Sequence, residues 1–104
     1  MFITAPAMDA TIGSMFNAFD ASGTIGAIRK VSFVSETADV LMREDATEDE
    51  KFTAIREMFL SEIRDVISTT EFHTTGPAST GAVVAFVNRV STADTPHVLG
   101  FTAS

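Results

Sequence analysis

The sequence predicts an α+β domain in which one long amphipathic helix packs on an antiparallel sheet of about four strands, in the order α-β-β-α-β-β. Residues 47–70 have a helical period and their own start signal, whereas residues 24–34 and 81–90 have the β-branched and apolar composition of strands. A shorter helix is expected near the N-terminus. Because 104 residues with 45% hydrophobic content suffice for one core, we expect a single compact domain over residues 1–104.

The first helix is expected over about residues 6–19. Pro6 suits the first turn of a helix, and one stripe is apolar: Met8, Ile12, Met15, Phe16 and Phe19. Its outer surface carries small residues where a solvated helix normally has long charged ones. Small side chains allow another backbone to approach closely, so this surface is a candidate oligomer interface, formed by Ala10, Gly13 and Ser14. The alternative is a short, weakly helical segment that only caps the core.

Two strands are predicted before the long helix. Residues 24–34 follow a turn at residues 20–23, and their alternation is imperfect because both faces mix apolar with polar or charged side chains. Residues 38–43 are predicted as the second strand, although this segment is short enough to be helical instead.

The long helix is predicted to begin at Thr47. Thr47 and Glu50 have the spacing of a capping box, in which the hydroxyl and the carboxylate each accept a backbone N–H of the first turn. Arg56 should lay its aliphatic stem along the edge of the core with its charge outward. Met58 lies on the polar face, either as an ordinary exposed residue or as an oligomer contact. Seven apolar side chains share the arc that should face the core: Phe52, Ile55, Phe59, Leu60, Ile63, Val66 and Ile67.

The C-terminal part is predicted to contribute two strands. Residues 81–90, GAVVAFVNRV, are apolar on both faces for most of their length, which is typical of a central strand. Residues 97–101 should return as the antiparallel partner. The loop at residues 73–81 is rich in turn formers and lacks the Gly-Lys-Ser/Thr ending of a phosphate-binding loop.

The net charge of −7 is concentrated around the long helix. Between Glu44 and Glu71 there are nine acidic and three basic residues, 3 − 9 = −6, and the remainder has five acids and four bases, 4 − 5 = −1. A negative total disfavours non-specific binding to nucleic acid or to anionic membranes. The acidic side of the helix is a candidate surface for a protein partner. The alternative is that these clustered charges only keep this side of the helix in contact with water, which is the more common case. Its residues are Glu48, Asp49, Glu50 and Glu57.

The sequence contains no catalytic or metal-binding motif. It has no Cys, and His73 and His97 lack the spacing of metal ligands. We therefore expect no enzyme activity, no cofactor and no metal. No run reaches the roughly 18 apolar residues of a membrane span, and the first ten residues lack the pattern of a signal peptide. We expect a cytoplasmic protein that does not bind membranes.

Three non-catalytic functions are compatible with these features. The first is a small acidic interaction or regulatory protein that self-associates through its sheet and its N-terminal helix, because two helices cannot cover a sheet that is apolar on both faces. The second is single-stranded nucleic-acid binding by side chains of the sheet: Arg29, Lys30, Phe33, Arg43, Phe86 and Arg89. These Phe residues could equally belong to the core. The third is an acidic helix surface that binds a basic protein or mimics nucleic acid.

Overall fold

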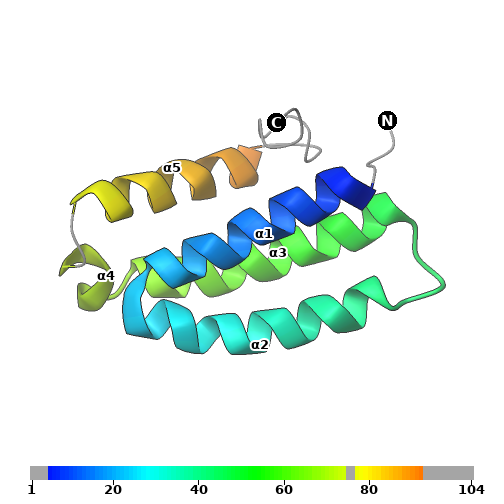
Figure 1. Cartoon of the computed structure of the whole chain (residues 1–104), viewed down its shortest axis with the longest axis horizontal. Helices are drawn as coiled ribbons and strands as arrows, with labels where there is room; N and C mark the ends of the chain where they lie inside the picture. The colour runs from blue at the N-terminus through cyan, green and yellow to red at the C-terminus, as the bar shows by residue number, and fades with distance from the viewer. Residues whose placement is uncertain (1–4, 75–76, 93–104) are drawn as a thin grey trace.

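The computed structural model describes residues 5–74 and 77–92, and within them the chain forms five helices and no strand (Figure 1). The predicted α+β fold is therefore wrong, and the chain forms a small helical bundle. The four long helices run alternately in opposite directions, and α4 is a short turn of helix between α3 and α5. The helices are α1 (Ala5–Ala21), α2 (Gly23–Leu41), α3 (Glu48–Ile67), α4 (Thr70–Thr74) and α5 (Pro77–Thr92).

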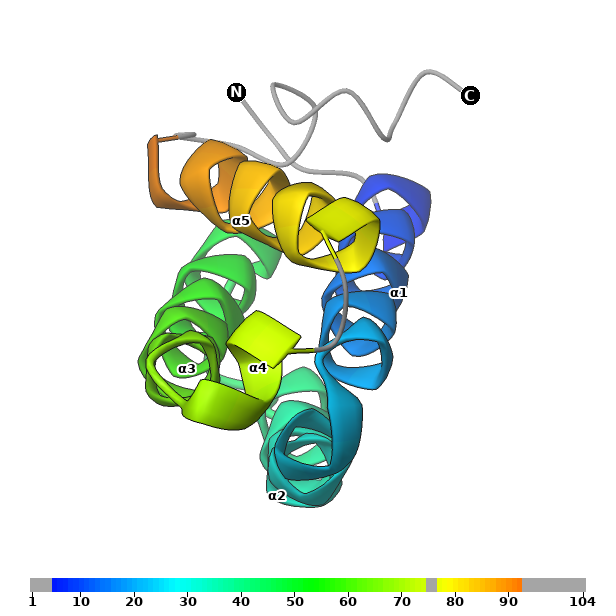
Figure 2. The same cartoon turned by 90° about the vertical axis from the view of Figure 1, so that its left-hand side faces the viewer.

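The four long helices surround one hydrophobic core. Seen along the bundle, α2 and α5 lie on opposite sides, and each packs against both α1 and α3 (Figure 2). Each long helix contributes one phenylalanine to the centre: Phe19, Phe33, Phe59 and Phe86. The ring of Phe59 lies 5.5–6.0 Å from the other three ring centroids, in the edge-to-face arrangement that aromatic pairs prefer. Phe59 on α3 therefore joins all four helices.

The two predicted helices are confirmed. The side chain of Thr47 accepts the backbone N–H of Glu50 at 3.1 Å, and the Glu50 carboxylate accepts the backbone N–H of Thr47 at 2.8 Å, so the capping box is formed. The helix ends at Ile67, three residues earlier than predicted. The predicted inner face is buried at Phe52, Ile55, Phe59, Ile63 and Val66, while Leu60 and Ile67 are partly buried against the core.

The predicted strands at residues 24–34 and 38–43 are wrong, because residues 24–34 and 38–41 belong to the single helix α2 and residues 42 and 43 follow its end. The helical alternative for residues 38–43 is correct as far as Leu41. The buried residues of α2 recur at helical spacing: Gly26, Phe33, Thr37 and Val40. The β-branched residues that suggested a strand lie mostly outside this buried set, and strand propensity is easily overridden by tertiary packing.

The predicted central strand at residues 81–90 is also wrong, because this segment belongs to helix α5. Its buried residues are Val83, Phe86, Val87 and Val90, which is the i, i+3, i+4, i+7 pattern of an amphipathic helix. The predicted strand at residues 97–101 lies outside the described residues.

The turn between α1 and α2 depends on two glycines. Gly23 has a φ of 89°, a backbone conformation that residues with a Cβ rarely adopt. Gly26 is buried where the start of α2 crosses the end of α1, and a Cβ there would collide with the carbonyl oxygen of Phe19 and the Cβ of Ser22. The two helices can pack this closely only because position 26 has no side chain.

Replacing Gly26 with Ala should lower the free energy of unfolding by about 1–3 kcal/mol, because the new methyl group meets backbone atoms that have little room to move. The matched control is Gly81→Ala, where a Cβ meets nothing within 4 Å. That substitution should raise stability by about 0.5–1 kcal/mol through helix propensity alone. Urea unfolding followed by circular dichroism measures both, and equal effects of the two substitutions would contradict the close crossing.

Candidate interaction surface on α2

Both ends of α2 are held by side chains from other helices. At its N-terminus, the Glu71 carboxylate on α4 accepts the backbone N–H groups of Thr24 and Ile25, the second at 3.2 Å. At its C-terminus, Lys51 Nζ on α3 donates to the carbonyl oxygen of Leu41 at 3.1 Å. An anion at the N-terminus and a cation at the C-terminus both complement the helix dipole. These contacts fix the position of α2 along the bundle.

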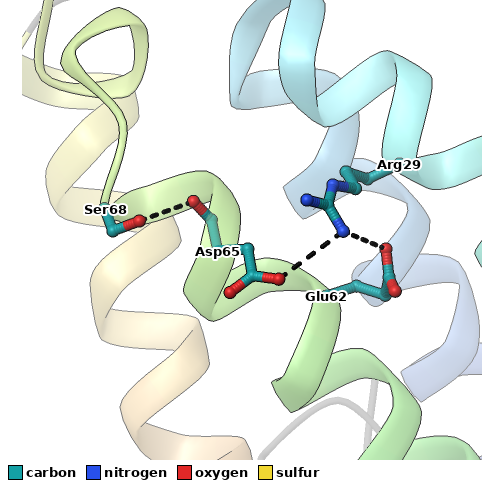
Figure 3. Close-up of polar contacts among 4 residues, drawn as sticks. All are labelled: Arg29, Glu62, Asp65 and Ser68. Atoms are coloured by element: carbon teal, nitrogen blue, oxygen red, sulfur yellow. Dashed lines mark hydrogen bonds and ion pairs between the residues drawn. The ribbon is translucent and has the colours of Figure 1, made fainter.

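The middle of α2 is held by Arg29. Its Nη1 lies 3.3 Å from Glu62 Oε2 and 3.5 Å from Asp65 Oδ2, both on α3 (Figure 3). The backbone carbonyl of Asp65 also accepts a hydrogen bond from Ser68 Oγ at 2.7 Å, close to the end of α3. Because Arg29 lies on the side of α2 that faces α3, these ion pairs favour the rotation of α2 in which the opposite face turns outward.

The face that turns outward is apolar. Four large side chains are exposed there: Ile28 (63%), Val31 (71%), Val34 (39%) and Met42 (79%). At 100° per residue, eight exposed and uncharged residues share an arc of about 120°. We call them the α2 outer face: Thr24, Ala27, Ile28, Val31, Val34, Ser35, Ala38 and Met42. Solvated helices normally carry charged side chains on such a face.

A groove of about 300 Å³ borders the α2 outer face on the side of α1. It is lined by Asp9, Ile12, Gly13 and Phe16 from α1 and by Val34, Thr37, Ala38 and Leu41 from α2. Thr37 is only 2% exposed, and its hydroxyl is the one buried side-chain polar atom in the described residues that lacks a hydrogen-bond partner. A second groove, of about 250 Å³, lies between α1 and α5.

Three of the residues predicted as an oligomer interface share one side of α1, because they lie at i, i+3 and i+4. Ala10 is exposed, Gly13 lines the groove between α1 and α2, and Ser14 lines the groove between α1 and α5. The hydroxyl of Ser14 donates to the carbonyl oxygen of Ala10 at 3.1 Å. Met58 is partly buried against the core of its own chain, which differs from the exposed position expected for it.

The residues predicted to bind nucleic acid are not brought together. The sheet that would carry them is not formed in the described residues, and α2 and α5 lie on opposite sides of the bundle (Figure 2). Phe33 and Phe86 are 0% and 5% exposed, so neither offers a stacking face. Two of the basic residues form ion pairs on α2: Arg29 pairs with Glu62 and Asp65, and Lys30 Nζ lies 2.9 Å from Asp20 Oδ2. The guanidinium of Arg89 lies over the ring of Phe86, and Arg43 is exposed beyond the end of α2.

The predicted acidic surface lies at and after the start of α3. Glu48 lies 3.6 Å from Lys51, and the backbone carbonyl of Asp49 accepts a hydrogen bond from the Thr53 hydroxyl. The backbone N–H and the hydroxyl of Thr47 hold the pKa of the Glu50 carboxyl below its ordinary value of 4.5. Glu57 is exposed further along the helix. The first three residues of this surface therefore support the start of the helix.

Sequence reasoning missed the α2 outer face as a functional surface. A signal was present, because positions 24, 28, 31, 35, 38 and 42 are all uncharged and follow a helical spacing. The assignment of residues 24–34 to a strand divided these positions between two sheet faces.

Replacing Thr37 with Val should raise the free energy of unfolding by about 1 kcal/mol, because the substitution keeps the shape and removes a buried hydroxyl that has no partner. Thr37→Ser is the control, since it keeps the hydroxyl and loses the methyl group, and it should lower stability. Chemical unfolding at neutral pH measures both variants. A loss of stability in Thr37→Val would show that the hydroxyl is satisfied in solution.

Replacing Glu50 with Gln should make the protein less stable at pH 7, and this difference should disappear in acid. The folded-state pKa of Glu50 is lowered, so the unfolded chain binds more protons and the carboxylate contributes stability above its unfolded pKa of about 4.5. That contribution is lost as the pH falls below 4.5 through the lowered pKa. Melting temperatures of the two proteins between pH 3 and pH 7 test this, and a pH-independent difference would contradict it.

Comparison with known proteins gives no functional assignment: no protein-family model, no curated protein and no solved structure matches the chain. None of the described helices is long and apolar enough to cross a bilayer. Among the residues that the structure describes, no three His, Asp or Glu side chains are grouped so that they could hold a metal ion. The α2 outer face is therefore the feature of the described residues that bears most directly on function.

Proposed function

We propose that this chain is a small, non-catalytic interaction protein that contacts another protein chain through the α2 outer face. One observation carries the proposal: the large hydrophobic side chains that are exposed among the described residues all lie on this face, at Ile28, Val31, Val34 and Met42. The opposite side of the same helix already completes the core. Exposed apolar surface that is gathered on one side of a molecule is typical of a protein contact site.

The support of α2 by its neighbours suits this role. Glu71, Arg29 and Lys51 link the helix to α3 and α4 at its start, middle and end. A contact helix that is already held in place loses little conformational freedom on binding, so more of the interaction energy appears as affinity. The groove beside the face also offers a recess into which a side chain of the partner can insert.

The two grooves support a non-catalytic role. The groove between α1 and α2 is lined by one ionisable side chain, Asp9, and the groove between α1 and α5 is lined by one, Arg89. Acid–base and nucleophilic catalysis usually require two or more cooperating groups in one site. Neither groove brings such a pair together.

Site-specific photo-cross-linking in cells that produce the protein tests this proposal. A benzophenone amino acid in place of Val31 should give covalent adducts with another protein chain, because the ring would lie inside the contact. The same substitution at Asn88, an exposed position on α5, is the matched control and should give none. Denaturing gels and mass spectrometry identify the adducts.

Circular dichroism first checks that every labelled variant is folded. The label is also placed at Glu57, on the acidic side of α3, which is the alternative contact surface. Adducts from Glu57 but not from Val31 would show that the partner binds the acidic surface, and would contradict the proposal. A folded Val31 variant that gives no adduct would also contradict it.

A further inference from the structure

We propose, as a step that rests on the proposed function, that the α2 outer face binds the same face on a second copy of this chain, with the two α2 helices antiparallel. Two properties of the face point to this partner. They are its lack of charge and the order of its large and small side chains.

The charge of α2 differs from that of the rest of the chain. The helix carries Arg29, Lys30, Glu36 and Asp39, 2 − 2 = 0, in a chain of net charge −7, and no charged residue belongs to the α2 outer face. Two copies of an acidic protein repel each other least where the meeting surfaces carry no charge. A basic partner would instead be attracted to the stretch between Glu44 and Glu71. The face therefore suits a second copy better than a partner selected by charge.

The order of large and small side chains along the α2 outer face suits an antiparallel pair. Ile28, Val31 and Met42 lie as far from residue 33 as Ala38, Ser35 and Thr24 lie on its other side. If a two-fold axis passes near Phe33, an antiparallel pair places Ile28 opposite Ala38 of the second copy. The same axis places Val31 opposite Ser35. Large residues then fill the space above small ones, as in a packed core.

A parallel pair would be less well packed. It would place each residue beside the identical residue of the second copy, so Ser35 and Ala38 would leave a hollow in the contact. It would also align the two helix dipoles in the same direction, which is less favourable than opposing them. Both effects favour the antiparallel arrangement.

The area of the face limits the strength of the dimer. Nineteen residues at 1.5 Å per residue give a helix about 28 Å long. A helix with its side chains is about 10–12 Å wide, so α2 offers about 300 Å² per chain and a dimer would bury about 600 Å² in total. This is less than stable interfaces bury, so we expect a weak, concentration-dependent dimer with a dissociation constant on the order of 100 µM.

Sedimentation velocity over a concentration series from about 1 µM to about 500 µM tests the dimer. The mass of the wild-type chain should rise from 11.1 kDa toward twice that value. Val31→Lys should raise the dissociation constant by at least about tenfold, because it places a charge in the contact. Asn88→Lys changes the net charge equally on α5 and should dimerise like the wild type. Ile28→Lys is a second variant, in case Val31→Lys is not stably folded.

Cross-linking through introduced cysteines tests the orientation, because the chain has no cysteine of its own. An equimolar mixture of Thr24→Cys and Met42→Cys chains, treated with a short bismaleimide, should give the mixed dimer. These two positions are eighteen residues apart, about 27 Å along the helix, so a parallel pair could not produce this dimer. In the antiparallel pair neither variant should cross-link to itself.

The outcomes separate the two proposals. Self-linking of Met42→Cys alone would overturn the antiparallel orientation. A wild-type chain that stays at 11.1 kDa at every concentration would overturn the second copy as partner, and adducts from Val31 with a different protein would leave the proposed function standing. A dimer that is unaffected by both lysine variants in α2 would place self-association elsewhere and overturn the inference.

Discussion

The rotation of α2 about its own axis is the constraint on which the rest of this structure depends. The helix has apolar side chains on two opposite faces, so burial of apolar surface alone does not strongly select the face that turns inward. Two residues favour the observed rotation: Gly26, which allows α1 to approach closely on the inner side, and Arg29, which pairs with Glu62 on α3. Glu71 and Lys51 bind the two ends of α2 and hold it along the bundle. Hydrogen bonds to charged groups contribute about 1.5–3 kcal/mol each, and the half-exposed Arg29 pair contributes less.

This rotation determines both the core and the surface. It turns Phe33 inward, where its ring lies 5.2 Å from that of Phe19 and 6.0 Å from that of Phe59. Phe59 in turn contacts Phe86 at 5.6 Å, so α2 is connected through α3 to the helix on the opposite side of the bundle. The same rotation leaves the α2 outer face exposed. The candidate contact surface is thus a direct consequence of how the core is completed.

The sequence predicts the parts of the fold that local patterns determine. α1 and α3 each have a one-sided apolar stripe, and the capping box of Thr47 and Glu50 marks where α3 begins. The helical structure of α2 was not predicted, because its outer face is rich in β-branched residues. The polar contacts that hold α2 also join residues far apart in the sequence, such as Arg29 with Glu62. The helical spacing of residues 83–90 was readable in the sequence, but a run that is apolar throughout also fits a buried strand. Assigning α2 to a sheet hid the candidate site, because self-association was then expected through the sheet and through the small residues of α1.

A contact between the α2 outer faces of two copies of this chain can be detected in solution. An isotope-filtered NMR experiment on a mixture of labelled and unlabelled chains reports only contacts between different molecules. We expect intermolecular contacts that involve the methyl groups of Ile28, Val31 and Met42, with Met42 close to the N-terminal half of α2 in the other chain. Intermolecular contacts that arise only from other helices, or none at about millimolar concentration, would contradict the α2 dimer.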